Sequence, residues 1–277
     1  MDVTNVQQVL ADAGSKLGIH TNFSLMLVTM ALLLCRVLPV IILTPIIGGE
    51  TTPTEVKFGL GVIIALVLFP QVAVERVPQS PVYVVGVLMK ELFVGYSLAF
   101  IVGRVFDAAQ VGGQLMDNLS GTNMAQVLVP SIQQTVSLYA SLKVQLFVTL
   151  FLTLNGHHLV INALADSLYT VPIDGFPRFS HGMWPFFQLV LRVFGDLFAV
   201  AIGISAPVLL AAFLTDVALG MINRVAPQVQ VFFISMQIKP AVSILIVFTS
   251  VHLIINRATG EFGVMFKILR EAIRLLG

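Results

Sequence analysis

The chain carries six apolar runs, and each is long enough to be a membrane-spanning helix. Such a helix needs about 20 apolar residues to cross a hydrocarbon core of roughly 30 Å. We therefore expect an all-α, polytopic fold of helical hairpins, with shorter amphipathic helices near residues 1–20 and 256–277. The six runs span residues 23–47, 56–74, 82–106, 136–154, 183–223 and 231–255.

Composition places the chain in the same class. Only 10% of its 277 residues are charged and 57% are hydrophobic, whereas soluble domains are about 25% charged. The formal net charge of +1 gives no electrostatic basis for binding nucleic acid. The single cysteine, Cys35, has no partner for an internal disulfide. No basic region followed by an apolar core marks a cleavable signal peptide, so the first apolar run is expected to direct insertion.

Charged residues interrupt several of the apolar runs. Arg36, Lys90, Lys143 and Lys239 all lie inside them. A charge at that depth is costly in lipid and normally faces protein or water. We interpret these side chains as pairing between neighbouring subunits of a larger assembly. A transport path is the alternative, since intramembrane charges often line one.

The run at residues 183–223 is too long for a single span, and we expect Pro207 to kink or break it. Arg192 and Asp196 are four residues apart and can neutralise each other on one helix face. Arg104 and Asp107 are three residues apart and close the third run in the same way.

Small residues recur every four positions in the same run, at Gly195, Ala199 and Gly203. Such spacing lets helix backbones approach closely. We expect this face to pack against a neighbouring helix.

Residues 112–134 form the longest polar interval between apolar runs. The interval is rich in amides and glycine, and its one charge is Asp117. We expect a loop whose glycines supply backbone freedom. Irregular backbone at membrane depth is tolerated inside a protein assembly or beside water. An ordinary connector between two helices is the alternative.

The ends of the chain give conflicting topology signals. The basic segment 256–277 favours a cytoplasmic C-terminus, and the acidic N-terminal stretch weakly favours the opposite side. Six spans would place both ends on one side. The clearest boundary lies at residues 171–182, where prolines, glycines and mixed charge gather.

No catalytic constellation is present in the sequence, and we expect no enzymatic activity, cofactor or metal. His157 and His158 are adjacent, so on a helix they point about 100° apart and do not share a face. No nucleotide-binding, hydrolase or zinc-binding motif occurs.

Four stretches resemble one protein family. They are CRVLPVIILTPIIGGETTPTEVKFGL at residues 35–60, GGQLMDNLSGTNMAQVLVP at 112–130, LNGHHLVINALADSLYTVPI at 154–173 and RVAPQVQVFFISMQIKP at 224–240. In this order they resemble the export-gate subunit of type III secretion systems, called SctT in injectisomes and FliR in flagella. The likeness covers nearly the whole chain.

Two details favour the injectisome branch over the flagellar one. The pattern DN-x-x-G-x-x-MA begins at Asp117, and residues 232–236 read FFISM. The chain also departs from the family, with Gln237 where proline is usual and Pro240 where serine is common. We expect the kink of this last segment to be displaced by three residues.

The resemblance implies a non-enzymatic structural subunit of the bacterial inner membrane, within the secretion-system basal body. A single copy is expected to join several FliP/SctR-type and FliQ/SctS-type subunits. The FlhB/SctU-type switch protein, the FlhA/SctV-type export protein and unfolded exported polypeptides are the further partners. Residues 1–180 would resemble the first of these subunits and residues 181–277 the second. The interval 112–134 would plug the closed channel.

The resemblance and the motifs together give the candidate site residues. For the plug they are Gly113, Asp117, Asn118, Gly121, Asn123, Met124, Gln126, Leu128 and Pro130. For assembly and helix packing they are Arg36, Gly195, Ala199, Gly203, Pro227 and Lys239. A secondary transporter is a competing hypothesis, and it would use helices that are discontinuous at Pro39 and Pro207.

Overall fold

A computed structural model describes residues 23–45, 52–72, 81–122, 137–179 and 182–277. All regular secondary structure in these ranges is helical, which confirms the all-α prediction. Five of the helices are long and apolar enough to cross a membrane. A sixth span is reached if the broken pair α6 and α7 counts as one. The chain is therefore a multi-pass membrane protein of the expected kind.

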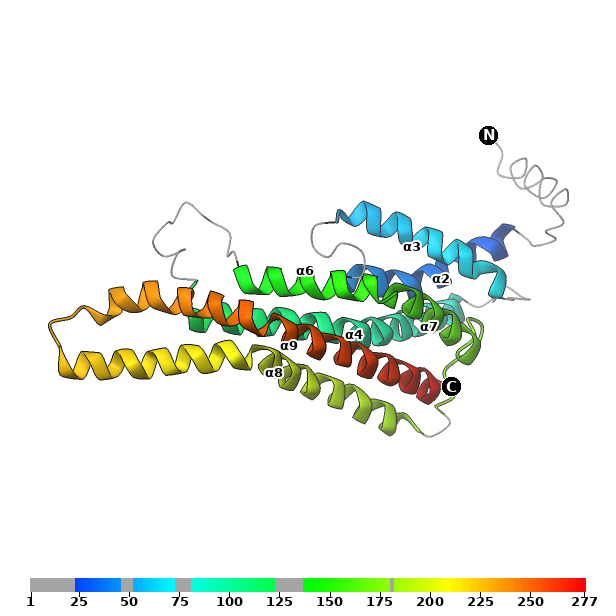
Figure 1. The fold of residues 1–277 in the computed structure, drawn as a ribbon. Helices are drawn as coiled ribbons and strands as arrows, with labels where there is room; N and C mark the ends of the chain where they lie inside the picture. Colours follow the sequence, from blue (N-terminus) through cyan, green and yellow to red (C-terminus); the bar gives the residue numbers. More distant parts are fainter. Residues whose placement is uncertain (1–22, 46–51, 73–80, 123–136, 180–181) are drawn as a thin grey trace. The chain divides into compact units, whose positions relative to one another are not determined.

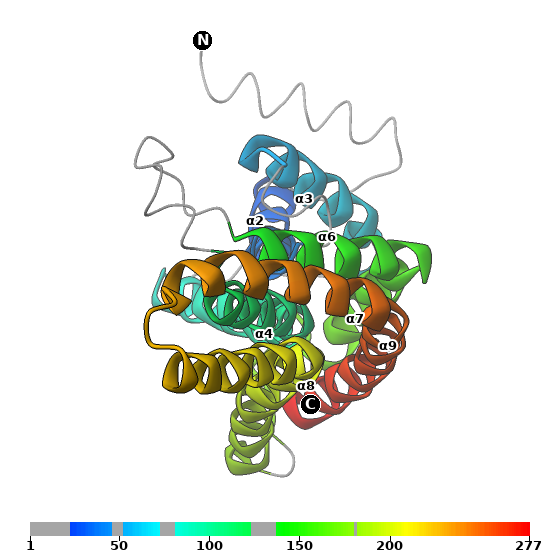
Figure 2. The ribbon, with the colours of Figure 1, turned by 60° about the vertical axis from the view of Figure 1, so that its left-hand side comes forward.

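Helices α2 (Phe23–Leu43) and α3 (Thr54–Leu68) form the first hairpin. They lie side by side in both views (Figures 1 and 2), and a short 3₁₀ turn, η2 (Phe69–Gln71), follows α3. Glu55 lies in the first turn of α3, where a negative charge favours the helix dipole. Helix α2 runs through Pro39, so the discontinuity that a transporter would need there is absent from this helix.

Three helices are much longer than a bilayer is thick. Helix α4 (Pro81–Ser120) has 40 residues, α8 (Met183–Val225) has 43 and α9 (Val231–Leu276) has 46. At 1.5 Å per residue they reach about 60–70 Å, roughly twice the hydrocarbon thickness. Helix α8 continues through Pro207, so of the two predicted outcomes the break is wrong and the kink stays a prediction. The basic tail is part of α9 and does not form a separate helix.

A break at Leu154 and Asn155 separates α6 (Leu138–Thr153) from α7 (Gly156–Thr170). Asn155 adopts a φ of 57°, a left-handed conformation that asparagine tolerates better than most residues. A Cβ on Gly156 would lie 2.4 Å from the Phe151 ring, so only glycine fits where the chain turns. The sequence NGHH at residues 155–158 predicts an interruption here. The structure places it at Leu154 and Asn155, and residues 156–158 already belong to α7.

The chain divides into two compact units that alternate along the sequence. Unit 1 holds residues up to Val102 together with His158–Phe186 and Leu269–Gly277, and unit 2 holds Gly103–His157 and Phe187–Ile268. This division reflects which residues pack together, and it does not test whether each part resembles another export-gate subunit. The expected resemblance of residues 1–180 and 181–277 to two subunit types therefore stays a prediction.

Each unit has its own buried core. In unit 2, four phenylalanine rings from α4, α6 and α9 meet with centroid distances of 5.4–6.0 Å. Edge-to-face and tilted arrangements at this separation are favourable for aromatic rings. The four rings belong to Phe106, Phe147, Phe151 and Phe262.

Candidate functional site

Arg36 lies at the centre of a buried ion cluster in unit 1. Its guanidinium is 1% exposed and donates to both carboxylate oxygens of Glu91, from Nε at 2.5 Å and from Nη2 at 2.8 Å. It also donates to the backbone carbonyls of Ser167 and Val171, each at 2.8 Å. Such a forked arrangement uses the fixed donor geometry of arginine.

Lys90 completes the cluster from the other side of Glu91. Its ammonium pairs with the same carboxylate and donates to the carbonyls of Pro172 at 2.9 Å and Ile173 at 3.1 Å. Together the two cations bond the carbonyls at and just after the end of α7, where the helix dipole is negative. The cluster therefore joins α2, α4 and the end of α7.

Three of the four charges that we interpreted as pairing between subunits have a carboxylate partner inside the chain. Arg36 and Lys90 find their carboxylate inside the chain, at Glu91. Lys239 of α9 pairs with Asp216 of α8 at 2.5 Å. Lys143, only 2% exposed, donates to the Ser205 hydroxyl at 3.1 Å. An assembly role for Arg36 and Lys239 remains a prediction.

Arg104 also differs from the sequence expectation. Its guanidinium approaches Asp196 of α8 at 3.5 Å and Glu261 of α9 at 3.3 Å. No ion pair of Asp107 or of Arg192 is found in the described part of the chain. The local pairings predicted for these residues are therefore wrong, because an arginine turned into the interior of unit 2 reaches carboxylates on other helices.

The end of α4 meets the start of α6 around Asp117, whose side chain is completely buried. Its carboxylate accepts hydrogen bonds from the backbone N–H groups of Tyr139 at 3.0 Å and Ala140 at 3.2 Å. It also accepts one from the Thr122 hydroxyl at 3.0 Å. We call these residues, with Gly113, the α4–α6 junction.

Glycines bring the helices together at this junction. A Cβ on Gly113 would lie 2.3 Å from the Cα of Ala140 on α6, and one on Gly112 would lie 2.7 Å from the carbonyl of Ala201 on α8. The Ser205 hydroxyl of α8 donates to the Gly112 carbonyl at 2.6 Å. Both glycines are helical, so they serve close packing. The expected backbone freedom of a loop is wrong at these two positions.

The structure therefore shortens the predicted loop of residues 112–134. Helix α4 continues to Ser120, and Gly121 with a φ of 74° turns the chain after it. Met116 is buried with Tyr139 and Val208 in the core of unit 2, while Asn118 lies on an exposed part of α4. The remaining candidates lie outside the described residues: Asn123, Met124, Gln126, Leu128 and Pro130.

The small-residue face of α8 is open. Gly195, Ala199 and Gly203 are all exposed. No described atom lies within 4 Å of a Cβ built on Gly195, and Gly203 meets only the Arg257 guanidinium, at 3.6 Å. Pro227 is exposed in the turn between α8 and α9. These positions are free of contacts that would hinder a neighbouring helix.

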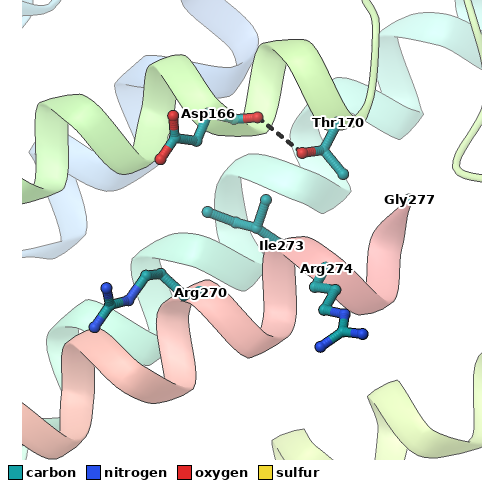
Figure 3. A pocket seen from close by; sticks show the side chains of 6 residues that line it. All are labelled: Asp166, Thr170, Arg270, Ile273, Arg274 and Gly277. Atoms are coloured by element: carbon teal, nitrogen blue, oxygen red, sulfur yellow. Dashed lines mark hydrogen bonds between the residues drawn. The ribbon is translucent and has the colours of Figure 1, made fainter.

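A shallow pocket of about 300 Å³ lies between the ends of α7 and α9 in unit 1 (Figure 3). Asp166 and Thr170 line it from α7, and the Thr170 hydroxyl donates to the Asp166 carbonyl at 2.9 Å. Arg270 and Arg274 line it from α9. The lining of the pocket therefore carries charges of both signs.

Sequence reasoning missed Glu91 and the capping role of Asp117. Glu91 follows Lys90 in an apolar run, and a carboxylate at that depth is itself a signal that a buried cation is near. The partners of Asp117 are 22 and 23 residues away, at a spacing that no local pattern encodes.

The comparisons with known proteins agree with one another. Residues 27–265 match the family described as bacterial export proteins, family 1. The flagellar biosynthetic protein FliR of Pectobacterium carotovorum is 30% identical over 241 residues, covering 87% of this chain and 91% of the relative. The Yop proteins translocation protein T of Yersinia pestis is 28% identical, covering 79% and 84%. The secretion system apparatus protein SsaT of Salmonella typhimurium is 30% identical, covering 59% and 61%.

Proposed function

The chain belongs to the bacterial export proteins, family 1, and we propose that it is a structural subunit of the export gate of a type III protein secretion apparatus. The observation that carries this function is the match over residues 27–265, nearly the whole chain. Relatives from flagellar and from virulence-type systems both align with it. They are named as export or biosynthesis components, and we propose a structural role without catalysis.

Assembly with other export-apparatus subunits is supported by the surface of the α8–α9 hairpin. Large apolar side chains on this hairpin are more than half exposed, which is typical of a surface that meets lipid or protein. Among them are Phe213, Leu214, Phe232, Phe233, Leu245 and Phe248. We propose that FliP/SctR-type and FliQ/SctS-type subunits cover these faces.

The proposed location is the inner membrane, within the basal body of the secretion system. The FlhB/SctU-type and FlhA/SctV-type proteins and the unfolded export substrates are the further partners that we propose. Helices of about 60–70 Å exceed a bilayer, so parts of them must lie in an assembly or in water. Co-expression with the candidate partners, followed by native mass measurement in mild detergent, tests this. Recovery of the chain only as a monomer would contradict it.

We further propose the injectisome branch. The DN-x-x-G-x-x-MA pattern from Asp117 and the FFISM stretch at residues 232–236 support it. Relatives of both branches share similar identity with the chain. Complementation decides between the branches. The gene should restore secretion in an injectisome strain lacking its own subunit and should fail to restore motility in the matching flagellar strain.

The plug assignment concerns the segment between α4 and α6. We propose that this segment, which starts after Thr122 and ends before Ser137, seals the closed gate. Deleting residues 123–129 spares the α4–α6 junction, so the complex should still assemble. It should, however, conduct ions in planar bilayers, where the intact complex stays closed. If the deletion abolishes assembly and never raises conductance, the segment is a structural strut.

A further inference from the structure

The start of α6 lacks a cap of its own. Its N-cap residue is Ser137, whose side chain makes no capping hydrogen bond to the described residues. The first N–H groups of a helix have no partner within the helix, and burying them unbonded is costly. In this structure the N–H groups of Tyr139 and Ala140 are bonded by Asp117, which belongs to another helix.

Asp117 supplies what a capping residue normally supplies, and adds a charge. Its two oxygens each accept one of the N–H groups that an N-cap side chain would bond. Its negative charge lies at the positive end of the α6 dipole. The same carboxylate accepts the Thr122 hydroxyl at 3.0 Å, so one side chain bonds residues on both sides of the connection from α4 to α6.

A lysine of α6 connects this junction to α8. Lys143 follows Tyr139 by four residues and therefore lies on the same helix face. Its ammonium donates to the Ser205 hydroxyl of α8 at 3.1 Å. Since Ser205 in turn bonds the Gly112 carbonyl, the polar contacts return to α4.

We propose that Asp117 is a positioning residue that fixes the start of α6 to the end of α4, and that the closed state of the gate depends on this bond. The second part rests on the proposed sealing function. In this proposal Asp117 holds the helices on either side of the sealing segment, and it does not itself block the channel. The other polar contacts hold the three helices but do not bond the first N–H groups of α6.

The variant Asp117→Asn tests the proposal in the complete complex, because it keeps the side-chain shape but removes the charge and one acceptor. Amide exchange at the start of α6 should accelerate about 5- to 30-fold, the factor expected for a lost cap. Ion conductance of the assembled, closed complex should rise as well. The matched control is Asp107→Asn, an exposed carboxylate on the same helix, which should change neither quantity.

Two results would overturn the proposal. If exchange at Tyr139 and Ala140 is unchanged in Asp117→Asn, the bond does not hold α6. If exchange accelerates without any rise in conductance, the bond does not support the closed state. Leak after deletion of residues 123–129, with none in Asp117→Asn, would refute only the role of Asp117. Absence of leak in the deletion would refute the sealing function itself.

Thr122→Val keeps the test decisive if Asp117→Asn fails to assemble. This substitution removes the hydroxyl that bonds the carboxylate and the backbone carbonyl of Asp117, so the carboxylate is held less firmly and the cap of α6 is weakened but not lost. The complex should then be recovered in full and should conduct more than the unaltered complex. Unaltered conductance in this variant would also refute the proposal.

Discussion

Glu91 shows how single side chains make the apolar runs compatible with buried charge. Its carboxylate is completely buried between Arg36 and Lys90. Each cation also bonds two backbone carbonyls at or after the end of α7. Removing one partner of such a cluster costs more free energy than the intact cluster contributes to folding, because the remaining charges stay buried and unpaired.

We therefore predict that Glu91→Gln lowers the free energy of unfolding by about 3–5 kcal/mol. The amide keeps the shape of the carboxylate but cannot neutralise two cations. Its NH₂ group is a hydrogen-bond donor, and it would face the donor groups of Arg36 and Lys90. Thermal unfolding of the purified chain in detergent measures the effect. Glu55→Gln, at an exposed carboxylate on α3, is the control. Equal melting temperatures for the two variants would contradict the prediction.

At the scale of the elements, glycine sets how closely the long helices approach. Gly113 touches α6 and Gly112 touches α8, and neither site has room for a Cβ. A Cβ on Gly95 of α4 would likewise lie 2.6 Å from the Arg36 carbonyl oxygen on α2. Membrane helices use small residues in this way, because backbone contact replaces the hydrophobic driving force that is missing between apolar helices.

Gly113→Ala should consequently destabilise the chain by about 1–3 kcal/mol, as overpacking does in well-packed interiors. Its control is Gly220→Ala, also in a helix but with no described atom within 4 Å of the added Cβ. There, alanine should be neutral or stabilise by up to about 1 kcal/mol through its helix propensity. Chemical denaturation of both variants in detergent gives the comparison. Equal changes in the free energy of unfolding of the two variants would show that α4 and α6 can move apart to accommodate the added methyl group.

At the scale of the whole molecule, charged side chains bond inside the chain while many apolar side chains face outward. The buried ions are bonded within the chain, while large apolar side chains remain exposed on α3, α8 and α9. A multi-pass protein of the export family has two environments for such surface, lipid and partner subunits. The open face at Gly195, Ala199 and Gly203 is where we expect a partner helix to come closest.

Gly203→Leu should reduce recovery of the complex while leaving the fold of the chain intact. The only described atom within 4 Å of a Cβ built on Gly203 is Nη2 of Arg257, at 3.6 Å. A partner helix packed on this face would meet the leucine directly. Co-purification with tagged partner subunits measures the loss, and Gly203→Ala, still a small residue, should assemble normally. Undiminished recovery of the leucine variant would exclude this face as an interface.

Sequence alone determined the helical class, the approximate spans and the family. Apolar runs of about 20 residues impose helices on any chain in lipid, because the backbone must bond within itself. An interruption near Asn155 was visible in the sequence for a similar local reason, since asparagine and glycine permit a turn there. The exact ends of the helices were not visible in the sequence. Helix α4 extends over residues 112–120, because its glycines there pack against other helices.

Only the tertiary structure decided the partners of the buried charges. Arg36 and Glu91 are 55 residues apart, and Asp117 lies 22 residues from the first N–H group that it bonds. Local spacing instead suggested Arg104 with Asp107 and Arg192 with Asp196, pairs that the structure does not form in the described residues. Helix periodicity fixes which face a side chain occupies, but the choice among carboxylates depends on which helices pack together, and that is a property of the folded chain.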